Sequence, residues 1–137
     1  MKKIFVDGKL MHMIFRKEDI KNGRIDVAPE EQFIQVSALS LERGKKFRPH
    51  KHIWKKPSFL QHIAQESWCV IEGKVLGYFY DTESNLLETH ELNPGDISLT
   101  FEGGHTYEIL EDCLVYEYKT GPYEGQERDK VFLENDI

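Results

Sequence analysis

The chain has 137 residues, enough for a single domain with its own hydrophobic core, and its formal net charge of −6 argues against general binding to nucleic acid. Its two cysteines, Cys69 and Cys113, form no disulfide framework, and we interpret both as buried, reduced thiols. No segment is long and apolar enough for a signal peptide or a membrane span, so we expect no membrane partner and a cytoplasmic location.

The first third of the chain is predicted to hold two strands. Residues 1–31 are mixed and charged, with a short strand expected over residues 11–15. A stronger strand is expected over residues 32–41, where apolar and polar side chains alternate. A basic segment follows Gly44, and its prolines exclude a continuous helix there.

The rest of the chain shows short strands at regular spacing. The predicted strands cover residues 67–72, 74–80, 86–92, 97–101, 106–110 and 113–119. Glycine, proline and short polar residues mark the turns between them, at residues 73, 81–85, 93–96, 102–104 and 111–112. Residues 120–137 turn polar and are interpreted as a C-terminal arm. This pattern predicts an all-β sandwich or barrel in a single domain, residues 1–137.

The basic segment carries two histidines that are candidate metal ligands. In a strand, His50 and His52 point to the same face, so both imidazoles can reach one metal ion. Their alternative role is to line a metal-free pocket. The cations around them form either a solvated loop or a rim that attracts a phosphate or carboxylate ligand: Lys45, Lys46, Arg48, Lys51, Lys55 and Lys56.

Two sets of residues have the spacing of known motifs. The first is Gly44-x5-His50-x-His52 with Glu66-x6-Gly73, and the second is Pro94-Gly95-Asp96 with Gly103-Gly104-His105. Over residues 32–119 the chain thereby resembles the cupin superfamily. The resemblance implies a cupin-type double-stranded β-helix, or jelly-roll barrel. It also implies one divalent metal ion (zinc, iron, manganese or nickel) bound by His50, His52, Glu66 and His105.

The chain departs from the cupin pattern at two places. Thirteen residues separate His52 from Glu66, where the family has three or four, so the intervening loop is longer and His62 is an alternative ligand to Glu66 or His105. Phe101 replaces a usual proline, and His105 falls one residue early. Glu66 has a second interpretation as an ion-pair partner of a lysine, and His105 has one as a turn residue.

A closer similarity concerns small bacterial cupins associated with surface-polysaccharide or nucleotide-sugar pathways. The runs that carry it are Gln65-Glu66, Gly73-Lys74-Val75, Gly103-Gly104-His105, Gly121-Pro122-Tyr123 and Asp129-Lys130. It implies a sugar-related ligand, of which an anionic sugar is one form. Sugar pockets need aromatic faces and hydrogen-bonding groups, so Lys51, Tyr78 and Tyr107 are the candidate ligand-binding residues, although core packing also explains the tyrosines.

Glu117 is the second candidate catalytic carboxylate beside Glu66. It shares a strand face with Val115, and an acid among core residues is costly unless it is paired. The hypotheses are a metal-dependent sugar isomerase, epimerase or lyase, a non-haem iron dioxygenase, or a barrel that binds a sugar or anion without catalysis. A homodimer is expected because edge strands leave backbone groups unpaired, and the N-terminal strand is a candidate for the exchange.

Overall fold

The structure is a computed structural model that describes residues 1–53, 63–121, 125, 127 and 130–133. Its elements are β1 (Lys2–Val6), β2 (Lys9–Phe15), the 3-10 helix η1 (Lys17–Asp19), β3 (Gly23–Asp26), β4 (Ser37–Ser40), β5 (Glu66–Tyr80), β6 (Leu86–Leu92), β7 (Ile97–Thr100) and β8 (Gly104–Lys119). The predicted all-β class is confirmed. No helix within these residues has the length and apolar character needed to cross a membrane.

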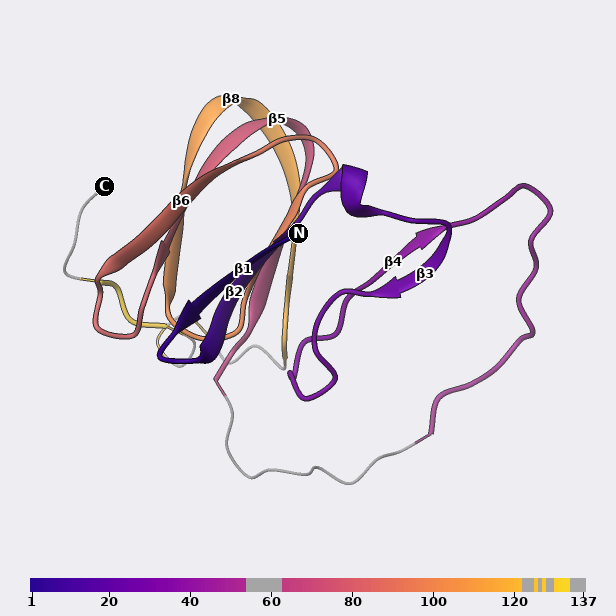
Figure 1. Cartoon of the computed structure of the whole chain (residues 1–137), viewed down its shortest axis with the longest axis horizontal. Helices are drawn as coiled ribbons and strands as arrows, with labels where there is room; N and C mark the ends of the chain where they lie inside the picture. The colour runs from indigo at the N-terminus through magenta and orange to yellow at the C-terminus, as the bar shows by residue number, and fades with distance from the viewer. Residues whose placement is uncertain (54–62, 122–124, 126, 128–129, 134–137) are drawn as a thin grey trace.

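Strand β5 organises the main sheet, which is antiparallel throughout. The order is β1-β2-β7-β5-β6, and β8 pairs with β5 as well. β8 follows β5 from one end to the other, while β7 pairs with Glu66–Cys69 and β6 with Val75–Tyr80. One edge of β5 therefore belongs to β8, and the other is shared by β7 and β6. The β3–β4 hairpin forms a separate two-stranded sheet (Figure 1).

The β5–β8 pair is sharply bent at Gly73. Its register shifts three times between Val70 and Val75, and Gly73 has a φ of 88°. Gly77, which pairs with Tyr107, lies nine residues beyond Trp68, or about 30 Å along a straight strand. Yet the rings of Trp68 and Tyr107 stack at 3.9 Å between centroids. The two halves of the pair therefore face each other, and β5 and β8 arch together in Figure 1.

This bend corrects two predictions. Residues 67–72 and 74–80 were expected to be separate strands joined at Gly73, and residues 106–119 to be a hairpin around 111–112. Each is instead part of one continuous strand. The turn-forming residues of both segments lie opposite each other, because Glu72 pairs with Leu114 and Lys74 with Glu111. They bend a strand pair, as β-bulges do, and do not reverse the chain.

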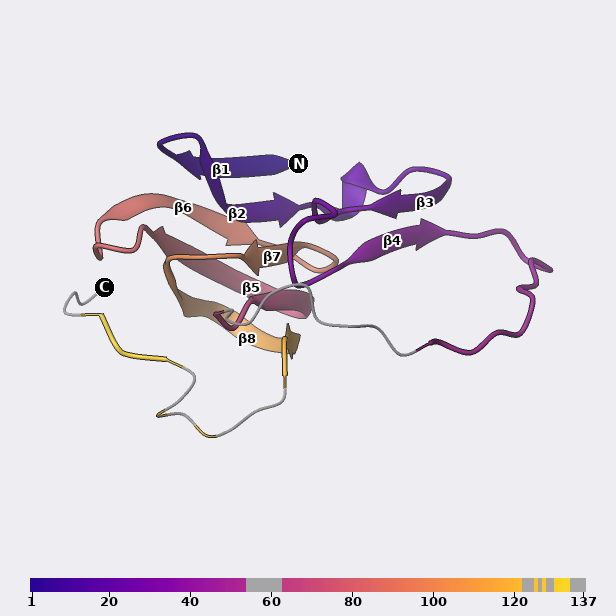
Figure 2. The same cartoon turned by 90° about the horizontal axis from the view of Figure 1, so that it is seen from below.

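Apolar side chains pack on both faces of the sheet. The face enclosed by the bend, which we call the inner face, carries Ile4, Ile14, Val70, Val75, Phe79 and Leu92. The opposite, outer face carries Met13, Phe15, Leu99 and Phe101, packed with Val27, Ala28 and Ile34. β2 and β7 are thus covered on both sides. In Figure 2 the β3–β4 hairpin lies beside the end of β2.

The strand predicted over residues 32–41 is mostly irregular, and only Ser37–Ser40 forms β4. Ile34 is buried, but its backbone N–H donates to the side-chain oxygen of Gln65 at 2.7 Å. That bond takes the place of a strand partner. Residues 86–92 form a strand as predicted, and the strand expected over residues 11–15 lies within β2.

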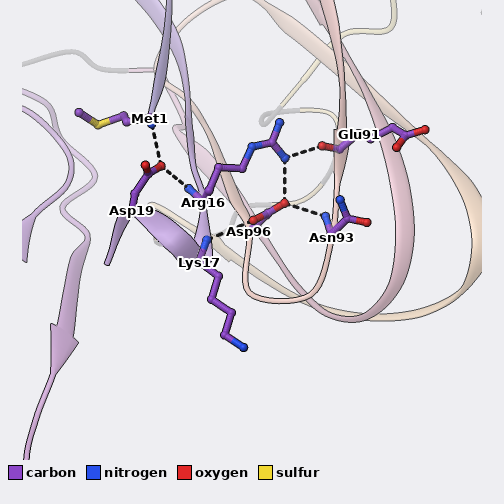
Figure 3. A network of polar contacts seen from close by, with 7 residues as sticks. All are labelled: Met1, Arg16, Lys17, Asp19, Glu91, Asn93 and Asp96. Atoms are coloured by element: carbon purple, nitrogen blue, oxygen red, sulfur yellow. Dashed lines mark hydrogen bonds and ion pairs between the residues drawn. The ribbon is translucent and has the colours of Figure 1, made fainter. Parts of the chain in front are cut away.

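Asp96 holds the β6–β7 turn to the end of β2 (Figure 3). Its carboxylate accepts hydrogen bonds from Arg16 Nη1 at 2.8 Å, from the Asn93 N–H at 2.8 Å and from the Lys17 N–H at 3.2 Å. The Arg16 guanidinium also donates to the Glu91 carbonyl at 2.6 Å. Asp96 is only 3% exposed, and buried polar groups are normally hydrogen-bonded. Its three donors satisfy this requirement for the carboxylate.

Candidate functional site

Two predicted site residues meet on the inner face because of the bend. Glu66 begins β5, and His105 lies at the start of β8, where it pairs with Phe79 at the far end of β5. Even so, His105 Nε2 lies 3.6 Å from Glu66 Oε1. The side chains of Glu66 and His105 are 17% and 20% exposed, so both are mostly buried but still reach the surface.

Glu117 completes a carboxyl pair with Glu66. Trp68, whose strand neighbour is Glu117, donates its indole N–H to Glu117 Oε1 at 3.0 Å. Burial, a hydrogen bond with Glu117 and the charge of Glu117 together raise the pKa of Glu66 to about 7. The pKa of Glu117 is lowered, first because it accepts that hydrogen bond. As the pH falls through about 7, the pair therefore takes up one proton, which binds to Glu66, while Glu117 stays ionised.

A buried hydrogen-bond chain behind the pair determines the protonation of His12. His12 is fully buried, and its Nε2 lies 2.9 Å from the Tyr80 carbonyl oxygen, which only accepts. Nε2 therefore carries a proton. Burial lowers the pKa of His12, so the imidazole is neutral and its Nδ1 is an acceptor. The Thr100 hydroxyl, 2.9 Å away, must donate to it.

The same chain fixes the tautomer of His105. Thr100 Oγ1 has its proton committed to His12, so it accepts from His105 Nδ1, which lies 2.9 Å away. Burial lowers the pKa of His105 to about 4, and the ring is neutral near pH 7. His105 Nε2 is therefore unprotonated, and its lone pair is available on the side facing Glu66.

An aromatic wall lies beside these groups. The stacked rings of Trp68 and Tyr107 are nearly parallel, at 7°. The Tyr107 hydroxyl bonds to Ser98 Oγ at 2.8 Å, and burial raises the pKa of Tyr107, so it remains neutral. The wall holds the Glu117 carboxylate through the Trp68 indole.

The structure brings together only part of the predicted site. Glu66, His105, Glu117 and Tyr107 lie in one cluster. The rings of His50 and His52 are 5.3 Å apart, but they and Lys51 are exposed in an extended segment. Tyr78 bonds to Glu108 at 3.4 Å, and His62 lies outside the described residues.

The described residues do not assemble the predicted four-ligand metal centre. Across residues 1–53, 63–121 and the short described stretches beyond, no three His, Cys, Asp or Glu side chains are placed to hold one ion. Glu66 and His105 form one pair of potential ligands, and His50 and His52 form another. The arrangement therefore does not fit a metal held by all four residues, and we derive no step through one.

Sequence reasoning missed three members of the cluster: His12, Thr100 and Ser98. A signal for His12 was present, because it interrupts the apolar run from Met11 to Phe15 and a buried imidazole there needs partners. The two cysteines are free, as predicted, but half-buried.

A separate groove of about 650 Å³ does not include the cluster. Its lining includes Lys3, Phe5, Lys9, Gln32, Phe33 and Gln65. Gln65 precedes Glu66 and bonds to Ile34 on the outer side of the sheet. We place the chemistry at the Glu66 cluster and not in this groove, because the perturbed carboxyl pair lies there.

Comparisons of the chain with protein-family models, with curated proteins and with solved structures gave no match. The functional argument therefore rests on the geometry and the chemistry of the cluster.

Proposed function

We propose that the chain is a cupin-like protein whose Glu66, Glu117 and His105 bind a small sugar or sugar-phosphate ligand and move a proton on it. The observation that supports this most strongly is that Glu66 lies 3.6 Å from His105 and is paired with Glu117 at a mostly buried site, where burial and Glu117 raise the pKa of Glu66 to about 7. A group with a pKa near the working pH is the most effective general acid or base.

The cluster offers an acid and two bases within one site. Protonated Glu66 can donate to a ligand oxygen, while the Glu117 carboxylate or the free Nε2 of His105 accepts a proton from a carbon or hydroxyl. Such a pair suits isomerisation or epimerisation next to a carbonyl, in which one group removes a proton and another returns one. Trp68 stacks on Tyr107 with one face and is only partly buried, so part of an aromatic ring of the kind that packs against sugars lies at the site.

The cupin-type jelly roll is part of this proposal. Its support is the antiparallel sheet bent over an enclosed face, with a first-motif glutamate and a second-motif histidine meeting on that face. Gly73, at the end of the first motif, lies at the bend itself.

The proposal predicts a carboxyl titration near neutral pH. In carbon-detected NMR, we expect the side-chain carboxyl of Glu66 to titrate near pH 7. In a Glu117→Gln variant its pKa should fall but stay above the ordinary glutamate value, because burial, the largest cause, remains. Glu72→Gln, at an exposed site on the same strand, is the control and should leave the titration unchanged.

Activity provides the second part of that test. With a sugar or sugar phosphate found by ligand screening, Glu66→Gln is expected to lower turnover about 100-fold while binding persists. A Glu66 titration at the ordinary glutamate pKa would overturn the acid–base proposal. Tight binding by the parent with no turnover would instead support a binding barrel.

A metal centre is the second candidate, and the tautomer of His105 favours it. Metal-ligating histidines commonly donate one ring N–H to a neighbouring acceptor while the other nitrogen binds the ion. His105 has this arrangement, with Nδ1–H on Thr100 and Nε2 free beside Glu66.

Metal content tests this candidate directly. For protein purified without a histidine tag or chelator, the candidate predicts near-stoichiometric zinc, iron, manganese or nickel by mass spectrometry. The metal should be lost in Glu66→Gln/His105→Gln. It should be lost in His50→Ala/His52→Ala only if the extended segment folds onto the site. A parent that takes up none of these metals on dialysis would rule the candidate out.

A further inference from the structure

Residues 41–53, which we call the basic arm, leave β4, loop out beyond the β3–β4 hairpin and then turn back in the two views (Figures 1 and 2). Every residue of the arm is exposed. Its hydrogen bonds and ring contacts join neighbours, such as the Lys45 N–H to the Glu42 carbonyl and the Lys45 ammonium over the Phe47 ring. Against one acid, Glu42, it carries the cations Arg43, Lys45, Lys46, Arg48 and Lys51.

Strand β8 carries charge of the opposite sign to the basic arm. In the described part of the chain it pairs with β5 alone, so its second edge presents unpaired backbone groups. The strand carries four exposed acids, Glu108, Glu111, Asp112 and Glu117, against the single cation Lys119. Large apolar side chains are exposed along it as well, including Leu114 at 56%, Tyr116 at 60% and Tyr118 at 60%. A long, exposed apolar edge of this kind normally needs a cover.

We propose that the basic arm of one copy of this chain binds the β8 edge of a second copy, and that the contact is made twice across a two-fold axis. Each surface supplies what the other lacks. The arm brings positive charge, the exposed Phe47 and Ile53, and extended backbone that can add to a sheet edge. The edge brings negative charge, apolar surface and unpaired backbone groups.

A second copy is the favoured occupant because the two surfaces carry opposite charge. The arm loops out on the β3–β4 side of the molecule, and its hydrogen bonds and ring contacts join residues within the arm (Figures 1 and 2). The chain is acidic overall, so the β8 edge repels most of another copy's surface and attracts its arm. In a two-fold dimer each arm binds the β8 edge of the other copy, so both arms and both edges are occupied.

The test exchanges charge between the two surfaces. The arm variant carries Lys45→Glu and Lys46→Glu, and the edge variant carries Glu108→Lys and Glu111→Lys. Glu117 is left unchanged, so the carboxyl pair is intact and the result does not depend on the proposed function. Oligomeric state is measured by size exclusion with light scattering, and dissociation constants by sedimentation at low and high salt.

We expect a dimer for the parent that weakens as salt rises, since the charges lie on exposed surfaces. Each variant alone should dimerise at least about tenfold more weakly, because like charges then face each other in both contacts. An equimolar mixture of the two variants should form heterodimers with nearly the parent affinity, because each arm again meets an edge of opposite charge. Lys3→Glu/Lys21→Glu makes the same change of charge away from both surfaces and should dimerise as the parent does.

Three results would each overturn the proposal. If the parent protein stays monomeric, the basic arm does not bind a second copy and any partner of the arm is a different molecule. If each variant on its own dimerises as tightly as the parent, the interface lies on another surface, for example on β1. A mixture that stays monomeric, although both variants keep the circular dichroism of the parent, shows that the two surfaces do not meet.

Discussion

Gly73→Ala is expected to destabilise the protein by about 3 kcal/mol or more, since it combines a strained backbone with a steric clash. The φ of Gly73 is 88°, where an added Cβ is unfavourable. That Cβ would also lie 2.7 Å from Cys113 Cβ and 2.8 Å from Cys113 Cα, and closer still to the Asp112 carbonyl oxygen. Most of these atoms are backbone atoms of β8, so only opening the bend relieves the contact.

The consequence for the site is as large as that for stability. Opening the bend separates Trp68 from Tyr107 and Glu66 from His105, since each contact joins the two halves of the β5–β8 pair. We therefore expect Gly73→Ala to lose the near-ultraviolet circular dichroism of the stacked aromatic pair, and the Glu66 carboxyl to return toward its ordinary pKa. Urea unfolding followed by tryptophan fluorescence measures the stability change.

Gly8→Ala is the matched control for backbone strain. Gly8 also has a positive φ, 78°, but a Cβ there would meet no atom within 4 Å. Its expected cost is about 1 kcal/mol, from strain alone. Equal losses in the two variants would contradict the close approach at the bend.

Asp96→Ala is expected to cost about 3 kcal/mol, because it leaves the Arg16 guanidinium without its carboxylate partner and frees the donors of the turn. The Asp96 side chain is 5% exposed, and that of Arg16 is 26% exposed. The turn it holds places Gly95 and Asp96 against Val70, whose N–H donates to the Asp96 carbonyl at 3.0 Å. Thermal unfolding and the urea midpoint measure the loss.

Asp26→Ala provides the comparison for Asp96→Ala. Asp26 also accepts from an arginine and a second donor, but its side chain is 65% exposed. An exposed pair contributes little, so we expect a near-parental midpoint. A comparable loss in both variants would show that burial is not what gives the Asp96 network its effect.

The site was partly predictable because some of its signals are local. Glu117 is a predicted site residue because it is an acid in phase with Val115, and its contacts with Trp68 and Glu66 make it the second member of the carboxyl pair. For His12 the sequence signals a buried imidazole but not its role, because its partners Thr100 and Tyr80 are distant in sequence.

Local patterns were enough to predict the all-β class, the 86–92 strand, the 93–96 turn and the residue types of the candidate site, because alternation and turn chemistry involve only a few neighbouring residues. Three features could not be predicted in this way: Gly73 bends a continuous strand pair, Glu66 meets His105, and His50 and His52 lie apart from both. Those outcomes depend on strand register and on which edges pair. Both are set by contacts between distant residues, which a local pattern does not record.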